Sequence, residues 1–139
     1  MSNKDKKKKI GKEAFFTRTK ANKGVRIPLV LPTGEETGEW LQVASIQSDV
    51  YRKVSTEERR KAVEAAMQKE DYEFDEIGIN SALVIDWSFD EECTRENVAA
   101  FLEEAPQIAD KINQVAMDNK RFFGNTPTQQ STGSDKKQT

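Results

Sequence analysis

The 139-residue sequence contains no histidine and only one cysteine, Cys93. Without histidine the chain lacks the commonest general base, the commonest metal ligand and the usual pH switch near neutrality. A single cysteine excludes a disulfide within the chain and a cysteine-rich metal site. No apolar run approaches the roughly 18–20 residues of a membrane span. No apolar stretch follows the N-terminal lysines, so we expect no secretory signal and a cytoplasmic protein.

Motifs for catalysis or cofactor binding are also missing. The glycines do not form a phosphate-binding loop, because no Gly-Lys-Ser/Thr follows them. The acidic run 90–92, with Asp86, lacks the spacing of a calcium loop. Cys93 stands beside Thr94 at a predicted helix start, a place that can lower a thiol pKa, but without histidine we expect a structural thiol. The sequence therefore predicts no enzyme, no metal and no cofactor.

Charge is distributed unevenly along the chain. Residues 1–12 hold six lysines against Asp5, whereas residues 13–139 carry a net charge of −7. Segment 1–12 cannot bury apolar surface and is predicted to be a disordered basic arm, and the polar segment 125–139 a disordered tail. An acidic body disfavours general nucleic-acid binding. A nucleic-acid site is therefore retained only as an alternative, and it would use the lysines of the arm: Lys6, Lys7, Lys8 and Lys9.

Residues 13–47 read as a β unit. Apolar residues alternate from Val25 to Leu31, the segment 32–34 is typical of a turn, and a returning strand is predicted over 40–46. Pro28 has no N–H to donate, so the first strand should lie at an edge of the sheet. We expect residues 15–20 to add a short third strand.

Residues 48–124 read as helical. Ser48 is expected to cap a helix over about 49–69. Ser55 and Glu58 form a second capping-box pattern, so the helix is expected to be either continuous or broken near Ser55. A second helix is predicted over about 73–87. Thr94 should cap a third helix, and Pro106 should open a fourth that ends at Gly124.

These patterns predict an α+β fold, mainly α, in one domain over 13–124. An N-terminal β-hairpin or small antiparallel sheet would pack on a bundle of about four helices. Helical periodicity aims Trp87, Phe89, Phe101 and Ile112 at a common core. An alternative interpretation makes Trp87 and Phe89 a partly exposed anchor for a partner helix.

The layout of residues 15–123 resembles the tail assembly chaperones of long-tailed, siphovirus-type bacteriophages. The most specific part is Leu83-Val84-x-x-Trp87-Ser88-Phe89, followed by Thr94-x-Glu96-Asn97, Pro106-x-Ile108 and Arg121-Phe122-Phe123. The β unit, with Phe15-Phe16, Val25-Arg26-Ile27-Pro28-Leu29 and the segment 32–41, is also similar. The lysine run at 4–9 departs from the pattern and leaves the role of the arm open.

The resemblance implies a function in phage tail morphogenesis. Proteins of this family coat the tape measure protein in the host cytoplasm, keep it soluble, help recruit tail tube protein and are absent from the mature virion. Often a longer form arises by frameshifting. The residues expected to bind the partner are Trp87, Phe89, Phe122 and Phe123. Two alternatives stay open: an adaptor that binds nucleic acid through its arm, and a structural tail subunit that polymerises through a strand edge. Self-association of the protein is also left open.

Removing both charged ends is predicted to leave the folded domain intact. Deletion of 1–12 and 125–139 should shift the thermal midpoint by no more than about one or two degrees, because neither end can bury apolar surface. Strong amide-exchange protection at Lys6–Lys9 or Gln129–Ser134 in the intact protein would show the prediction of disorder to be wrong.

Overall fold

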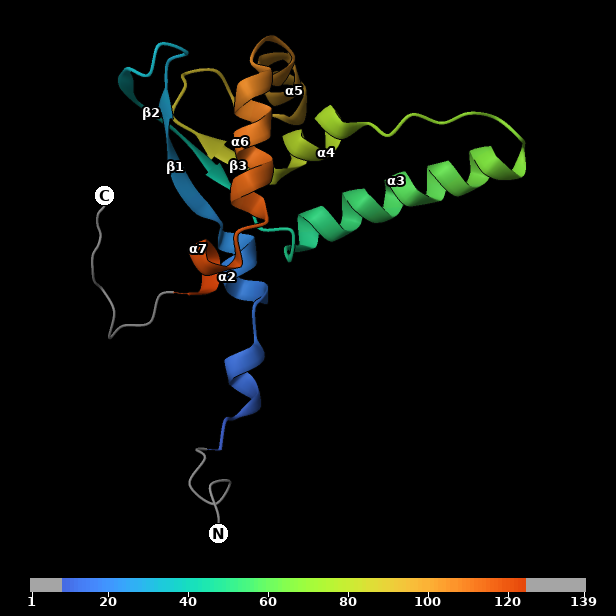
Figure 1. The fold of residues 1–139 in the computed structure, drawn as a ribbon, viewed down its shortest axis with the longest axis horizontal. Coiled ribbons are helices and arrows are strands. Elements are labelled where there is room, and N and C mark those ends of the chain that lie inside the picture. Colours follow the sequence, from blue (N-terminus) through green and yellow to red (C-terminus); the bar gives the residue numbers. More distant parts are fainter. Residues whose placement is uncertain (1–8, 125–139) are drawn as a thin grey trace.

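The computed structural model describes residues 9–124 (Figure 1). Its elements, in chain order, are η1 (Lys12–Phe15), α2 (Arg18–Lys23), β1 (Val25–Val30), β2 (Glu36–Val43), α3 (Asp49–Met67), α4 (Glu76–Leu83), β3 (Val84–Trp87), α5 (Arg95–Glu104), α6 (Pro106–Ala116) and α7 (Asn119–Phe123). The fold is therefore α+β and mainly α, as predicted. Most of the basic arm and all of the C-terminal tail lie outside the described residues.

The three strands form one antiparallel sheet in the order β1-β2-β3. Ile27 on β1 lies opposite Leu41 on β2, and Leu41 lies opposite Trp87 on β3. This row is buried and forms the centre of the sheet's inner face. Pro28 is exposed on β1, an edge strand, as predicted, and the register shifts between Pro28 and Val30.

The third strand is not where the sequence predicted it. Residues 15–20 form no strand: η1 ends at Phe15, and α2 begins at Arg18. Segment 18–23 is rich in lysine, arginine and alanine, which favour helix. Gly24, with φ of +77°, then ends α2 and turns the chain into β1. Here the local helix propensity outweighed the alternation that suggested a strand.

The predicted helix over 73–87 is also corrected. It begins at Glu76 and stops at Leu83, and β3 follows directly at Val84. An apolar run such as 82–85 suits a buried helix or a buried strand equally well, and β-branched Val84 and Ile85 favour the strand. The open edge of β2 decides between helix and strand, because β2 pairs with residues 84–87 and makes them β3. Ala44 N–H also donates to the Leu83 carbonyl at 2.8 Å.

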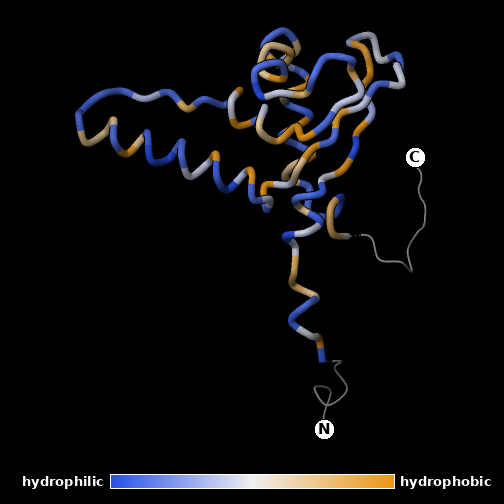
Figure 2. The backbone as a smooth tube through the Cα atoms, turned by 180° about the vertical axis from the view of Figure 1, so that it is seen from behind, coloured by the Kyte–Doolittle hydropathy of each residue, from blue (hydrophilic) through white to orange (hydrophobic). Residues whose placement is uncertain are grey.

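Helix α3 agrees closely with its predicted range. The Ser48 hydroxyl accepts a hydrogen bond from the Tyr51 N–H at 3.2 Å, as expected of a cap. Of the two alternatives for this helix, the continuous one is confirmed, because α3 runs through Ser55. The Ser55 hydroxyl donates to the Arg52 carbonyl and does not start a separate helix. The helix projects from the rest of the molecule, and the segment 68–75 returns alongside it (Figures 1 and 2).

The last helices follow their sequence signals with one break. The Thr94 hydroxyl accepts from the Asn97 N–H at 3.0 Å and starts α5, and Pro106 is the first residue of α6. The predicted fourth helix ends at Ala116 instead of continuing to Phe123. Asp118 caps a separate short helix, α7, which ends at Gly124 as predicted. A good capping residue inside an apolar pattern thus divided one predicted helix into two.

The predicted aromatic cluster is present. The Trp87 and Phe89 ring centroids are 5.1 Å apart, those of Trp87 and Phe101 are 5.9 Å apart, and all pairs meet edge to face. Ile112 is fully buried in the same core cluster. Trp87 is only 6% exposed, and its indole N–H donates to the Glu91 carbonyl at 2.7 Å. Trp87 is therefore a core residue rather than a surface anchor.

Truncating Trp87 should be strongly destabilising. Trp87→Ala is expected to lower the free energy of unfolding by about 3–5 kcal/mol, because it removes a buried ring from the core. The matched control is Trp40→Ala: Trp40 is half-buried on β2, with the Arg26 guanidinium 3.8 Å from its ring centroid. That change should cost only about 1 kcal/mol. Equal losses in denaturant unfolding would contradict the central position of Trp87.

Candidate functional site: an apolar groove

An open groove of about 380 Å³ lies between the end of β1 and the corner where α5 meets α6. We call it the β1–α5 groove. Its lining is mostly apolar and comes from five parts of the chain: Leu29, Val30, Leu31, Pro32, Thr37, Glu39, Phe89, Phe101, Glu104, Ala105, Gln107 and Ile108. Because these residues are far apart in the sequence, the groove exists only in the folded protein.

One wall of the groove is the end of β1. Val30 and Leu31, which are adjacent aliphatic residues, are 47% and 46% exposed. They are held by a tight turn: Leu31 N–H donates to the Glu35 carbonyl at 2.8 Å, and Gly34 N–H donates to the Leu31 carbonyl at 2.7 Å. Gly34 has φ of +95°, which favours glycine. The exposure of Val30 and Leu31 is therefore fixed by the backbone.

The opposite wall belongs to the aromatic cluster and the helix corner. The Phe89 and Phe101 ring centroids are 5.3 Å apart, and both residues are half-buried, so part of each ring remains accessible. Between α5 and α6 the backbone leaves helical geometry at Ala105, because the residue before a proline disfavours it. The corner leaves Ala105 half-buried next to the rings.

The rim of the groove is polar and includes two carboxylates, Glu39 and Glu104. Glu39 is held in position by the Ser88 hydroxyl, which donates to its carboxylate at 2.7 Å. Ser88 also accepts from the Trp40 N–H at 2.8 Å, so this part of the rim is anchored to the sheet. The groove is thus an apolar surface with a negatively charged border.

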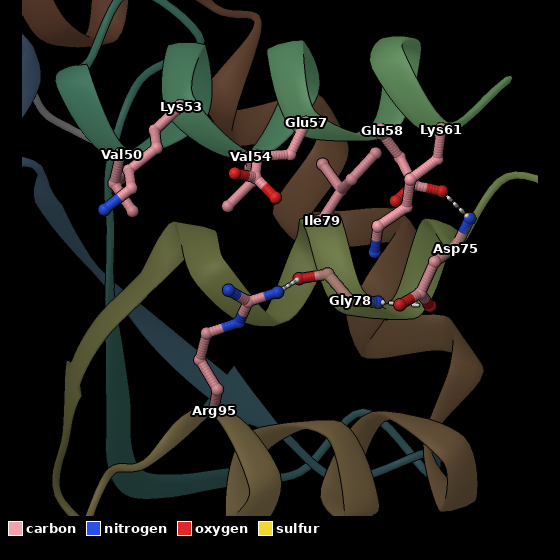
Figure 3. A pocket seen from close by; sticks show the side chains of 10 residues that line it. All are labelled: Val50, Lys53, Val54, Glu57, Glu58, Lys61, Asp75, Gly78, Ile79 and Arg95. Atoms are coloured by element: carbon pink, nitrogen blue, oxygen red, sulfur yellow. Dashed lines mark hydrogen bonds between the residues drawn. The ribbon is translucent and has the colours of Figure 1, made fainter. Parts of the chain in front are cut away.

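A second hollow, of about 360 Å³, lies between α3 and α4 (Figure 3). It is lined largely by charged residues, among them Lys53, Glu57, Lys61 and Arg95. The Arg95 guanidinium donates to the Gly78 carbonyl at 3.2 Å, so one of these cations already has a partner. Nothing in this hollow pairs a nucleophile with a base.

A buried carboxylate closes one end of this second hollow. Glu58 accepts hydrogen bonds from the Tyr72 hydroxyl and from the Asp75 N–H, the latter at 2.8 Å. The hydrogen bond from Tyr72, and then that from Asp75, keep the pKa of Glu58 below its ordinary value. The same hydrogen bond raises the pKa of Tyr72 to about 12. Glu58 therefore ties the returning segment 68–75 to α3 and has a structural role.

Cys93 lies in the acidic turn between β3 and α5. Cys93 is half-buried, and burial raises the pKa of its thiol, contrary to the lowering that a helix start can cause. Its sulfur lies 3.9 Å from the Val84 carbonyl oxygen. Within residues 9–124, no group of three or more histidine, cysteine, aspartate or glutamate side chains is arranged to hold a metal ion.

The sequence-predicted partner residues divide into two groups. Trp87 and Phe122 are buried in the core, so neither offers its ring to a partner. Phe89 and Phe123 are half-buried, and of these two Phe89 lines the groove. Lys9 is exposed, whereas the other lysines predicted for nucleic acid, Lys6, Lys7 and Lys8, lie outside the described residues.

Sequence reasoning missed the two most exposed aliphatic residues of the groove, Val30 and Leu31. It placed Leu31 in a strand, and no pattern showed that α5 would face the end of that strand. Glu58 was also missed, although a signal existed. It falls midway between Val54 and Ala62 at i+4 spacing on α3, so its carboxylate had to lie on the inner stripe of the helix.

No protein-family model matches the chain, nor does any curated protein or solved structure. Among the helices of residues 9–124, none has both the length and the apolar character needed to cross a bilayer.

Replacing Glu58 should release Tyr72. In Glu58→Gln the phenol pKa should fall from about 12 toward the ordinary value of about 10, because the charged acceptor is gone. Phenolate absorbance during an alkaline titration measures this. Glu57→Gln, at the exposed neighbouring position, is the control and should leave the titration unchanged. An unaltered high-pH transition in Glu58→Gln would contradict the assigned contact.

The same contact predicts how stability depends on pH. Because the folded pKa of Glu58 is depressed, its contribution is present above the unfolded pKa and is lost as pH falls through the folded value. The wild type should therefore lose more stability than Glu58→Gln on acidification below about pH 5. Parallel acid-unfolding curves for the two proteins would show that Glu58 is not coupled to folding.

Proposed function

We propose that this protein is a tail assembly chaperone of a long-tailed bacteriophage, and that it binds the tape measure protein through the β1–α5 groove. A tape measure protein is a long helical chain with apolar stripes, which is insoluble alone. A protein that keeps such a chain soluble needs an apolar surface with a polar border, not a catalytic centre. The groove supplies such a surface, and it is the observation that carries the proposal.

The groove is suited to one face of an amphipathic helix. Helix-in-groove recognition places apolar side chains at i, i+3, i+4 and i+7 in an apolar channel. Val30 and Leu31 on one wall, and Phe89 and Phe101 on the other, offer aliphatic and aromatic contact to such side chains. The bound helix would cover the exposed parts of these residues, which is the main source of affinity in contacts of this kind.

Charge would then set the orientation of the partner. Glu39 and Glu104 on the rim favour basic residues that flank the apolar stripe of the bound helix. Segment 13–139, with its net charge of −7, would also keep a complex of many copies in solution. Glu39 is fixed by Ser88 before binding, so this part of the rim needs no ordering when the partner arrives.

The remaining parts of the proposal follow from the resemblance. The protein would act in the host cell cytoplasm during tail assembly, help recruit tail tube protein, and be absent from the finished virion. It would do so by binding, without catalysis. The resemblance rests on the order of motifs over residues 15–123, and the groove adds a surface on which the central binding step can occur.

Co-expression with the tape measure protein of the same phage tests the function. The chaperone should increase the soluble fraction of its partner, and the pulled-down complex should survive high salt because the contact is mainly apolar. The nucleic-acid alternative predicts the reverse. If partner solubility does not rise, and DNA is instead retained at low salt only while residues 1–12 are present, the chaperone assignment fails.

A charge placed in the groove should abolish this effect. Leu31→Glu puts a carboxylate against the apolar lining and leaves the core cluster intact, since Leu31 is 46% exposed and lies outside that cluster. The matched control is Val63→Glu on α3, where the side chain is 56% exposed and outside the groove. Solubilisation should be lost in Leu31→Glu and kept in Val63→Glu. Loss in Val63→Glu alone would move the binding surface to α3.

A further inference from the structure

The segment just before α2 exposes three large apolar side chains. Ile10, Phe15 and Phe16 are 66%, 74% and 66% exposed, and every residue from 9 to 16 is exposed. Neighbouring Lys9 and Lys12 make the segment basic. We call residues 9–16 the N-terminal knob. Apolar side chains gathered in this way on a protruding element are typical of an interaction surface.

The knob is held away from the groove of its own chain. Arg18 on α2 forms a salt bridge with Asp49 at 2.9 Å, and Asn22 donates to the same carboxylate at 3.0 Å. These contacts fix α2 to the start of α3, and the knob extends beyond α2. Figure 1 shows the knob at one end of the molecule and the β1–β2 turn with the α5–α6 corner at the other. A single copy in this arrangement cannot fill its own groove.

We propose that the N-terminal knob of one copy docks into the β1–α5 groove of a second copy. Phe15 and Phe16 enter between Leu31 and the Phe89–Phe101 rings, and bury apolar surface that both copies otherwise leave in water. Lys9 and Lys12 then meet the carboxylates of the groove rim. The contact is head to tail, because the two surfaces differ and lie at opposite ends of the molecule.

Charge complementarity fits the knob of a second copy to the groove in the absence of another partner. The rim of the groove carries Glu39 and Glu104, which repel an acidic segment, and most of this chain is acidic. Within residues 9–124, the knob is the stretch that combines exposed aromatic rings with basic neighbours and only one acidic residue, Glu13. A head-to-tail contact repeats, so it generates open chains or closed rings rather than a simple dimer.

This contact also regulates the binding of the tape measure protein. Only this regulatory part of the inference rests on the proposed function. A groove filled by a neighbouring knob is closed to other apolar partners. The helix of a tape measure protein would therefore have to displace the knob. Until it does, the knob and groove shield each other from non-specific contacts. Removing the apolar side chains of the knob should leave the groove permanently open and partner binding at least as strong as in the wild type.

Sedimentation velocity of the full chain without any partner tests the self-association. The wild type should show a mass that rises with concentration between about 1 μM and about 1 mM, the range in which contacts of small area dissociate. Phe15→Ser/Phe16→Ser removes the two aromatic rings of the knob, and Leu31→Glu places a charge in the groove. Each should weaken self-association at least about tenfold, because each removes an anchor of the contact. Val63→Glu, outside both surfaces, should associate like the wild type.

Mixing the two defective variants gives the sharpest result. Phe15→Ser/Phe16→Ser keeps an intact groove, and Leu31→Glu keeps an intact knob. The pair should form a heterodimer that grows no further, because one copy lacks a knob and the other a usable groove. A wild type that stays monomeric over the whole range overturns the proposal. So does a mixture in which both variants remain monomeric.

Failure here is distinguishable from failure of the chaperone function. If Phe15→Ser/Phe16→Ser solubilises the tape measure protein but the wild type never self-associates, only the knob contact is wrong. If the wild type self-associates and the two variants form their heterodimer, but neither the wild type nor any variant solubilises the tape measure protein, the knob contact stands and the chaperone function is wrong.

Discussion

The pairing of β3 with β2 is the constraint on which the rest of the fold depends. Leu41 lies opposite Trp87 and Ile27, so that one buried row crosses all three strands. No linker separates β3 from α4, which ends at Leu83. The strand pairing therefore also fixes where α4 lies against the sheet. Trp87 closes the row, and its ring packs edge to face on Phe89 and Phe101.

The same constraint builds the groove. Beyond Trp87 the chain stays attached to β2, because the Ser88 N–H donates to the Trp40 carbonyl at 3.1 Å. Ser88 then orients Glu39 on the rim, and the next residue, Phe89, lies in the groove wall. Three consecutive residues thus have three roles: Trp87 packs in the core, Ser88 positions the rim carboxylate, and Phe89 lines the groove. The motif that carries most of the family resemblance therefore shapes the groove: Phe89 lines it, and Trp87 is buried in the core.

The sequence predicted what local chemistry decides. Ser48 and Thr94 began helices, Gly124 ended one and Pro106 opened one, because capping and proline effects act within a few residues. It failed at β3, where propensity allowed helix or strand and only the free edge of β2, about 40 residues away, decided between them. Long-range pairing of this kind leaves no mark in a local window.

The candidate site was predictable only in part, for the same reason. Phe89 was identified as a partner residue and does line the groove, but its neighbour Trp87 is buried. Val30 and Leu31 are ordinary strand and turn residues in the sequence. They line a groove only because the fold brings the α5–α6 corner beside them. Glu58 was different, since its position on the inner stripe of α3 was visible from spacing alone.

The proposed function depends on the binding of an apolar helix in the β1–α5 groove. Amide exchange of the full chain, at a concentration at which it is monomeric, is measured with and without a peptide from an apolar helical stripe of the tape measure protein. If the helix binds there, we expect the peptide to slow exchange at 29–32 and 101–108 and to leave α3 and its return segment 68–75 unchanged. Slower exchange confined to α3 and 68–75, with no change along the groove, would contradict it.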